Sequence, residues 1–368
     1  MPQFPFGCEE DERGDQDQWN DDRGGDQQLL VLLAALLSAG APDAAERNPL
    51  FRDHAPLKAV LSAPISQAYA QRLSDVSLYF PGQWAYIDDN GAKHRLQVSI
   101  RLRGNFRRDY CELPPLRLNF KKSEVKGTLF AGQDKLKLVA HCRDRSDRYE
   151  QNLIKEYLAY RILNMLTDIS YRVRLARVTY IDSEKKQQDR VQYAFFIEHK
   201  DRLAARIGRT EQEIESAEIT AIEPDHLNLL SMFQYLIGNV DFSPIAGSNG
   251  ECCHNYAMFG TNADALVPVP YDFDFSGIVN APNAELDTER GVERMGQRVY
   301  RGYCENNDAV EGSVATFEQL REALYAVVGE LEELEPGIRR NITSYMDEFY
   351  EVIGDPRQVE QQITGKCI

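Results

Sequence analysis

The stretch KLKLVAHCRDRSDRYEQNLIKEYLAYRILNML, residues 135–166, decides the fold class of this chain. Its first residues alternate lysine with leucine, which is typical of a strand with one buried face. From about Tyr149 the pattern changes, and apolar side chains recur at helical spacing as far as Leu166. A strand that leads directly into a long apolar helix indicates that helix and sheet pack against each other.

Strand patterns lie on both sides of this stretch. Residues 96–103 and 116–120 alternate apolar with polar side chains, and residues 171–181 and 191–198 form two more strand-like runs joined by the polar turn SEKKQQD. The first part of the chain is therefore predicted to be strand-rich, with one embedded helix.

Beyond residue 200 the pattern becomes mainly helical. We expect helices at 226–237, near 316–330 and at 335–351, and a short strand pair at 255–259 and 265–271. The sequence thus predicts an α+β chain with two lobes, a strand-rich lobe at 47–200 and a helical lobe at 201–368. Ligands commonly bind at such a junction.

Residues 1–46 fit neither lobe. The first 28 residues carry nine acidic side chains against two arginines, and the apolar run LLVLLAALL at 29–37 precedes the small residues Ala39-Gly40-Ala41. This run resembles the core and cleavage site of a secretory signal, although its flank is acidic, and it is too short for a comfortable membrane span. The alternative is an ordinary helix packed on the body. We expect an exported chain, periplasmic or secreted, without an integral membrane span.

The amino-acid composition excludes some classes of protein and some classes of partner. The 368 residues are 43% hydrophobic and 10% aromatic, which is enough for a large core and excludes a disordered protein. With 42 basic and 58 acidic residues the formal net charge is −16, so nucleic acid is an improbable partner.

Cysteine usage bears on the compartment. Of seven cysteines, six remain after residue 41, and none forms a CxxC pair. Six cysteines allow about 15 pairings, so the connectivity is open. Buried free thiols are the alternative for each cysteine alone, but an exported, disulfide-bonded protein fits the whole set better.

A dense group of polar residues lies within a mainly apolar stretch of the sequence, between residues 239 and 277. Asp241 follows the helix at 226–237, Asn255 opens a strand, and Asp272 and Asp274 stand at the end of another strand. Carboxylate and amide oxygens suit Mg²⁺, and a separate aspartate can position or deprotonate a hydroxyl. We therefore assign Asp241 as the catalytic base and Asn255, Asp272 and Asp274 as metal ligands. Taken singly, each could also be an ordinary cap or turn residue.

The strand-rich lobe supplies candidate nucleotide contacts. Arg103 and Gly104 follow a strand, where glycine lets the backbone approach phosphate and arginine can pair with it. Lys137 and Glu156 are candidates for a lysine–glutamate pair, with Lys135, Lys122 and Arg117 as rivals of Lys137 and a surface salt bridge as the alternative. Glu198 lies in the link between the lobes, where backbone groups would read adenine.

These residues resemble the spore-coat protein H (CotH-type) family of atypical, protein-kinase-like enzymes. The resemblance covers roughly residues 95–280 and rests on RLRGN at 101–105, PPLRLNF at 114–120, the stretch at 135–166, GNVD at 238–241 and YDFDF at 271–275. It implies a kinase-like fold, ATP with Mg²⁺ or Mn²⁺, and extracytoplasmic phosphorylation of Ser or Thr in a protein substrate. By the same resemblance Asp241 is the catalytic aspartate and Asp272 binds metal, with Asp274 as its rival.

Three hypotheses follow. The first is an exported, metal-dependent phosphotransferase that uses ATP and an unknown protein substrate. The second is a catalytically inactive pseudokinase or envelope scaffold, and the third is a nucleotidyl (AMP) transferase on the same fold. Hydrolase and dinucleotide-binding classes fare worse, because the chain contains no GxSxG, HExxH, Walker A or dinucleotide fingerprint.

Overall fold

The computed structural model describes residues 48–73, 77–88, 90–144, 146–245, 252–262 and 265–368. The acidic tail and the signal-like run at 29–37 lie outside these residues. Among the helices within these residues, none combines the length and the hydropathy that a membrane span needs.

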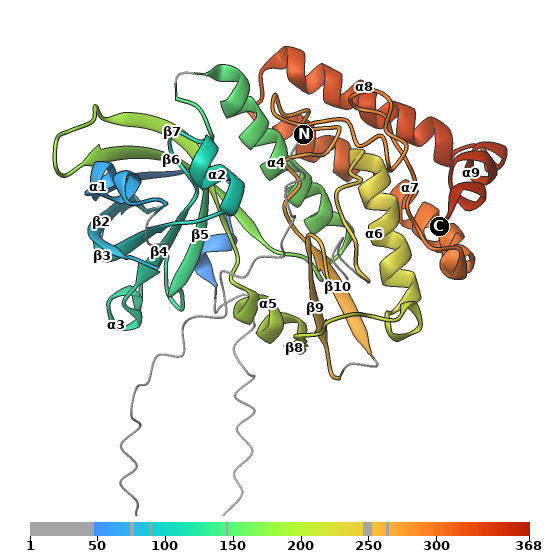
Figure 1. Ribbon diagram of the computed structural model, residues 1–368, viewed down its shortest axis with the longest axis horizontal. Helices are drawn as coiled ribbons and strands as arrows, with labels where there is room; N and C mark the ends of the chain where they lie inside the picture. The colour runs from blue at the N-terminus through green and yellow to red at the C-terminus, as the bar shows by residue number, and fades with distance from the viewer. Residues whose placement is uncertain (1–47, 74–76, 89, 145, 246–251, 263–264) are drawn as a thin grey trace, which may run out of the picture.

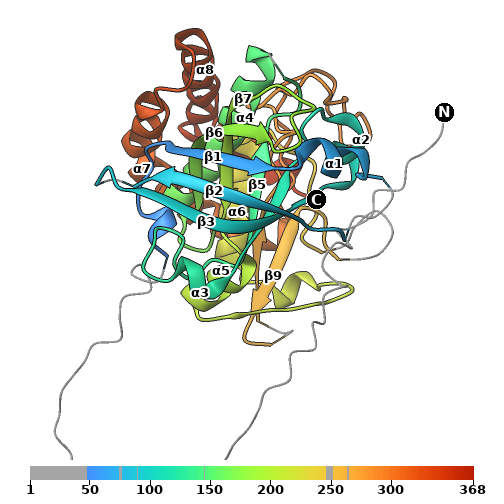
Figure 2. The ribbon, with the colours of Figure 1, turned by 90° about the vertical axis from the view of Figure 1, so that its left-hand side faces the viewer.

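Seven strands close into a barrel in the order β1-β2-β3-β4-β5-β7-β6 (Figures 1 and 2). Neighbouring strands are antiparallel, except that β1 and β6 run parallel where the barrel closes. Edge-to-face contacts of Trp84 with Phe130 and Phe196 fill the interior, at ring-centroid distances of 5.9 and 5.5 Å. The strands are β1 (Leu57–Ala63), β2 (Phe80–Ile87), β3 (Lys93–Leu102), β4 (Leu116–Phe120), β5 (Lys135–Ala140), β6 (Val173–Asp182) and β7 (Arg190–Ile197).

The barrel region contains more helix than the sequence pattern indicates. The predicted embedded helix is present as α4 (Asp147–Leu166), but three short helices accompany it: α1 (Ile65–Ala70), α2 (Asn105–Tyr110) and α3 (Lys122–Val125). The expectation of a single embedded helix is therefore wrong. Segments of six residues or fewer span less than two helical turns, which is too little to produce a recognisable apolar period.

Helix α4 lies between the barrel and the C-terminal helices (Figure 1). It contacts β6 and β7 on one side and α7 on the other, and most of its residues are buried. Its apolar side chains therefore belong to the same core as the C-terminal region. Polar side chains of α4, among them Glu156, are held at the junction of the two regions.

The C-terminal region is mainly helical, as expected. The predicted strand pair is present, and a third short strand joins it. Helix α6 has a proline in its first turn and ends at Gly238, whose φ of 64° suits a glycine cap. The elements are α5 (Lys200–Ile207), β8 (Thr210–Glu211), α6 (Pro224–Ile237), β9 (Tyr256–Gly260), β10 (Leu266–Pro270), α7 (Val310–Glu330), α8 (Pro336–Ile353) and α9 (Pro356–Gln362).

Three disulfides settle the pairing that the sequence leaves open. Cys111–Cys142 joins the end of α2 to the chain just beyond β5, Cys304–Cys367 anchors the C-terminal segment, and Cys252–Cys253 joins neighbours. Disulfides of this kind fit an oxidising compartment outside the cytoplasm.

Candidate active site

Helix α2 carries an arginine, Arg107, into the junction between the two regions. Strand β3 ends at Leu102, and Gly104, with φ of 82°, turns the chain into the helix. Residues with a Cβ rarely adopt this backbone conformation, which explains the glycine in the RGN segment. The Cys111–Cys142 disulfide holds the other end of α2.

Arg107 binds carboxylates from two other parts of the chain. Its Nη2 donates to Asp274 Oδ2 at 2.6 Å and to Glu156 Oε2 at 3.3 Å, and Asp272 Oδ1 lies 3.9 Å away. We call Arg107, Glu156, Asp272 and Asp274 the junction cluster. It links α2, α4 and the segment after β10, so it connects the barrel to the C-terminal region.

The junction cluster perturbs the acidity of its own members. Burial raises the pKa of Glu156 to about 7, with Arg107 opposing the shift and Asp274 adding to it. For Arg107, burial lowers the pKa, but the charges of Asp274, Glu156 and Asp272 outweigh it and raise the pKa. Glu156 therefore keeps its proton to a higher pH than an ordinary carboxyl group does.

Asp272 is the exposed carboxylate of the cluster. Its side chain is 51% exposed, compared with 20% for Asp274. Its backbone N–H donates to Tyr160 Oη at 2.9 Å, and its φ is 62°, in the left-handed region that few residues with a Cβ adopt. Strained backbone of this kind concentrates at functional sites.

Asp241 lies just beyond the end of α6, and neighbouring side chains orient it. Its carboxylate oxygens contact His254 Nε2 at 2.7 Å and Asn255 Nδ2 at 3.1 Å. Its backbone N–H donates to Asn239 Oδ1, while the amide of Asn239 in turn donates to buried Gln234. Each carboxylate oxygen has two lone pairs, so Asp241 retains capacity to accept another hydrogen bond.

Asn255 connects Asp241 to the junction cluster. Its side-chain amide also donates to the backbone carbonyl oxygen of Asp241 at 2.7 Å. The backbone carbonyl oxygen of Asn255 accepts the N–H of Tyr271 at 3.0 Å. Tyr271 directly precedes Asp272 in the chain. The structure therefore brings Asp241, Asn255 and Asp272 into one region.

A row of cations crosses the barrel strands opposite this region. Arg101, Arg117 and Lys137 are direct register partners on β3, β4 and β5, so their side chains share one face of the sheet. The Lys137 ammonium lies 5.6 Å from the centre of the Tyr271 ring, which directs this face toward the segment with Asp272. Like charges placed directly opposite one another repel, and an anion close to the row would offset this repulsion.

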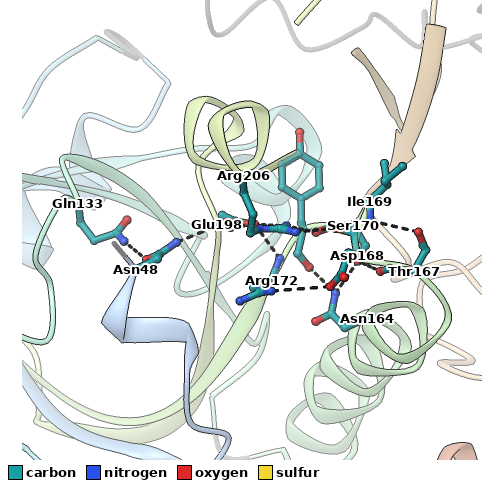
Figure 3. A network of polar contacts seen from close by, with 11 residues as sticks. Asn48, Gln133, Asn164, Thr167, Asp168, Ile169, Ser170, Arg172, Glu198 and Arg206 are labelled. Carbon is teal, nitrogen blue, oxygen red and sulfur yellow. Dashed lines mark hydrogen bonds and ion pairs between the residues drawn. The ribbon is translucent and has the colours of Figure 1, made fainter. Parts of the chain in front are cut away.

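Glu198, the candidate in the link after β7, lies in a dense polar network (Figure 3). Its carboxylate accepts from Arg206 Nη2 at 2.8 Å, from the Arg172 N–H at 3.2 Å and from Asn48 Nδ2 at 3.3 Å, and its own N–H donates to the Arg172 carbonyl. The side chain and the N–H of Glu198 thus stabilise the link itself. A contact with adenine would have to come from its carbonyl oxygen.

The structure differs from the sequence prediction in the partner of Glu156. Lys137 was expected there, whereas the contact observed for Glu156 is with Arg107. Arg103, predicted to contact phosphate, lies near enough to Glu156 to favour its charged form. The sequence patterns do not assign a role to Arg107, Arg101 or His254. The signal for Arg107 was the Arg107-Arg108 pair just after RGN, and the signal for His254 was its position beside Asn255.

The atoms that could coordinate a cation at this site are oxygens, which suits Mg²⁺ or Mn²⁺. Among the residues that the structure describes, no three His, Cys, Asp or Glu side chains form a ready-made metal site. Two hollows, of about 510 and 540 Å³, lie elsewhere and are not lined by the junction cluster.

Comparisons with protein-family models and with curated proteins find no match for this chain.

Proposed function

We propose that this chain is an exported, kinase-like phosphotransferase that uses ATP and Mg²⁺ or Mn²⁺ to phosphorylate Ser or Thr of a protein. One observation carries the proposal. The cationic row of Arg101, Arg117 and Lys137 faces the segment that holds Asp272, and Asp241 is linked to that segment through Asn255. Phosphates next to the row and a cation next to Asp272 would complete an arrangement suited to phosphoryl transfer.

The donor set fits a divalent cation that keeps water and phosphate oxygens as further ligands. Asp272 would be the main ligand, because its carboxylate is half exposed. Asn255 would add its side-chain oxygen, since its amide nitrogen faces Asp241. Asp274 would join only if its 2.6 Å contact with Arg107 lengthened. When bound, the cation would neutralise charge that develops on the phosphates.

Asp241 would act on the acceptor hydroxyl. It would accept a hydrogen bond from the hydroxyl and take its proton as the oxygen bonds to the terminal phosphorus, while the bond between that phosphorus and the leaving ADP oxygen breaks. His254 and Asn255 would hold the carboxylate in place during this step. Lys137, Arg117 and Arg103 would stabilise the phosphates.

Thermal unfolding of the full chain with ATP, with and without Mg²⁺ or Mn²⁺, tests the binding part. A ligand of the native state must raise the unfolding midpoint by mass action. We expect a rise that needs the metal and is lost in Asp272→Asn, but kept in the exposed control Asp308→Asn. No rise with either metal at millimolar ATP would contradict the proposal.

Transfer to casein, followed with ATP labelled on the terminal phosphate, tests the chemistry. Asp241→Asn should lower the rate by about 10²- to 10⁴-fold while the metal-dependent ATP binding persists, because general-base catalysis contributes rates of that order. Label appearing in protein from α-labelled ATP instead would identify nucleotidyl transfer, the third hypothesis.

One observation favours the second hypothesis, a pseudokinase or scaffold. Arg107 already neutralises Asp274, one of the predicted metal ligands, at 2.6 Å. An arginine in this position can replace the charge of a cation. This hypothesis expects no metal-dependent midpoint shift in the wild-type chain, so the same experiment separates the two.

A further inference from the structure

The side chain of Arg107 lies where the proposed divalent cation would bind. Its Nη2 is 2.6 Å from Asp274 Oδ2 and 3.9 Å from Asp272 Oδ1, so one nitrogen lies close to oxygens of both proposed metal ligands. Mg²⁺ holds its oxygen ligands at about 2.1 Å. A cation shared by the two aspartates would therefore have to bind directly beside the guanidinium or in its place.

The positive charge of Arg107 opposes the binding of a second cation. Two like charges about 4 Å apart repel each other even in water, and more strongly where water is partly excluded. The Arg107 side chain is 20% exposed and that of Glu156 is 5% exposed, so the solvent screens the cluster incompletely. A divalent ion carries twice the charge of a guanidinium, which doubles the repulsion. Arg107 and the cation therefore compete for Asp274.

The two aspartates differ in how closely Arg107 contacts them. Asp272 is 51% exposed, and its 3.9 Å separation from Nη2 is longer than a hydrogen bond. Asp274 is 20% exposed and accepts a hydrogen bond from Arg107 directly. An arriving cation would meet the Asp272 carboxylate first and would gain Asp274 only as Arg107 withdraws. The observed arrangement is thus a closed state of the proposed cation site.

Glu156 gives the guanidinium a second place to bind. The same Nη2 lies 3.3 Å from Glu156 Oε2, so it can leave Asp274 without losing every carboxylate. A guanidinium only donates hydrogen bonds, and a nitrogen shared by two acceptors can move toward either one. The side chain has several rotatable bonds. The shift therefore needs no movement of α2, whose ends are set by Gly104 and by the Cys111–Cys142 disulfide.

We propose that Arg107 makes an autoinhibitory contact, in which it neutralises Asp274 until a divalent cation displaces it toward Glu156. This inference rests on the proposed function, because Asp272 and Asp274 are metal ligands only within it. It differs from the pseudokinase hypothesis, in which Arg107 replaces the cation permanently.

Titration of the full chain with Mn²⁺ alone, followed by the electron paramagnetic resonance signal of the free ion, tests the competition without any catalytic readout. We expect Arg107→Met to bind Mn²⁺ at least about tenfold more tightly than the wild type, because the repelling charge is gone. Equal or weaker binding by Arg107→Met would overturn the inference. The gain should disappear when Asp274→Asn is added to Arg107→Met, and a gain that persists would overturn the assignment to Asp274.

Arg209→Met is the matched control. Arg209 also donates to a carboxylate at 2.6 Å, that of Glu223, and its side chain is 22% exposed. The substitution changes the net charge by the same amount, but Glu223 lies at the start of α6, outside the junction cluster. Mn²⁺ affinity should therefore stay at the wild-type value, and an equal gain in this control would overturn the inference. If Arg107→Met does not fold, Arg107→Gln takes its place, because it removes the charge but keeps a donor for Asp274.

Thermal unfolding with ATP and Mn²⁺ separates this inference from the proposed function. A gain in Mn²⁺ affinity for Arg107→Met, without a midpoint shift by ATP in either protein, would support the Arg107 contact and contradict the phosphotransferase proposal. A metal-dependent ATP shift in the wild type, without a gain in Mn²⁺ affinity for Arg107→Met, would support the phosphotransferase proposal and overturn the autoinhibitory contact.

Discussion

Two buried glutamates, Glu198 in the link after β7 and Glu156 on α4, face arginines in different surroundings. Glu198 accepts hydrogen bonds from Arg206, from the Arg172 N–H and from Asn48 (Figure 3). Glu156 has a 3.3 Å contact with Arg107, an arginine that lies closer to Asp274. Glu198 is thus well supplied with donors, and Glu156 shares its donor with a competing carboxylate.

This difference separates a carboxylate that stabilises the surrounding chain from one whose pKa is raised. A buried carboxylate with several donors is stabilised as the anion and holds the surrounding chain together. With a shared donor, burial dominates, and the pKa of Glu156 rises to about 7. Perturbed groups of this kind cluster at functional sites, whereas the Glu198 network gives the link its shape.

The largest effect is expected from Arg206→Met, which leaves Glu198 buried without its guanidinium. Removing one partner of a buried ion pair costs about 3–5 kcal/mol in the free energy of unfolding, because an uncompensated charge remains. Urea denaturation at pH 7 measures the loss. Arg357→Met is the matched control, since the Arg357 side chain is 86% exposed and its pair should contribute less than about 1 kcal/mol. Equal losses in the two variants would contradict the structural role of Glu198.

The next effect concerns pH. The pKa of Glu156 is raised from 4.5 to about 7 in the folded chain, so the native state binds more protons than the unfolded state between these values. The contribution of Glu156 to stability is therefore full below about pH 4.5 and is lost as pH rises through about 7, by at most about 3 kcal/mol. The measurement is the difference in unfolding free energy between wild type and Glu156→Gln, followed from pH 5 to pH 8. This difference gives the pH-dependent contribution of Glu156 to stability. A flat difference would mean that Glu156 titrates normally.

Much of the fold could be predicted from the sequence because it depends on local periodicity. The strand at 96–103 and the long helix ending at Leu166 repeat their patterns over enough residues to be recognised, and both are present. Helix α2 could not be recognised, because its six residues are too few to show a helical period. Closure of the barrel through the parallel pairing of β1 with β6 is a long-range event that no local pattern records.

The candidate site was predictable where its members are close in sequence. Asp241, Asn255 and Asp272 belong to one cluster of polar residues in an otherwise apolar stretch. Hydrogen bonds connect Asp241 to Asn255, and Asn255 to Tyr271, which directly precedes Asp272. Arg107 was missed because its partners Glu156 and Asp274 lie 49 and 167 residues away. The chemistry of a buried glutamate predicts Lys137 as its partner, but the short helix α2 places Arg107 beside Glu156.

A smaller loss is expected from Arg107→Met. It removes the cation shared by Glu156 and Asp274, but the side chain is 20% exposed and Glu156 can take up a proton in response. We therefore expect a loss of about 2 kcal/mol at pH 7, less than for Arg206→Met, and a smaller one at pH 5. Urea denaturation at the two pH values checks both points. A loss as large as that of Arg206→Met, unchanged between pH 5 and pH 7, would remove the distinction between the two sites.

The smallest loss sharpens the comparison most. Glu156→Gln mimics the protonated form that the folded chain favours, whereas the unfolded wild-type chain is already ionised at pH 6, so at this pH we expect no loss of unfolding free energy and a gain of at most about 2 kcal/mol. Glu198→Gln should cost more, because a neutral amide replaces the carboxylate that accepts from the Arg206 guanidinium and from the Arg172 N–H. The two substitutions are chemically identical, and both side chains are buried, so any difference reflects the donors around them. A larger loss for Glu156→Gln than for Glu198→Gln would mean that the anion is needed at the junction cluster, where the competing charge of Asp274 argues for the proton.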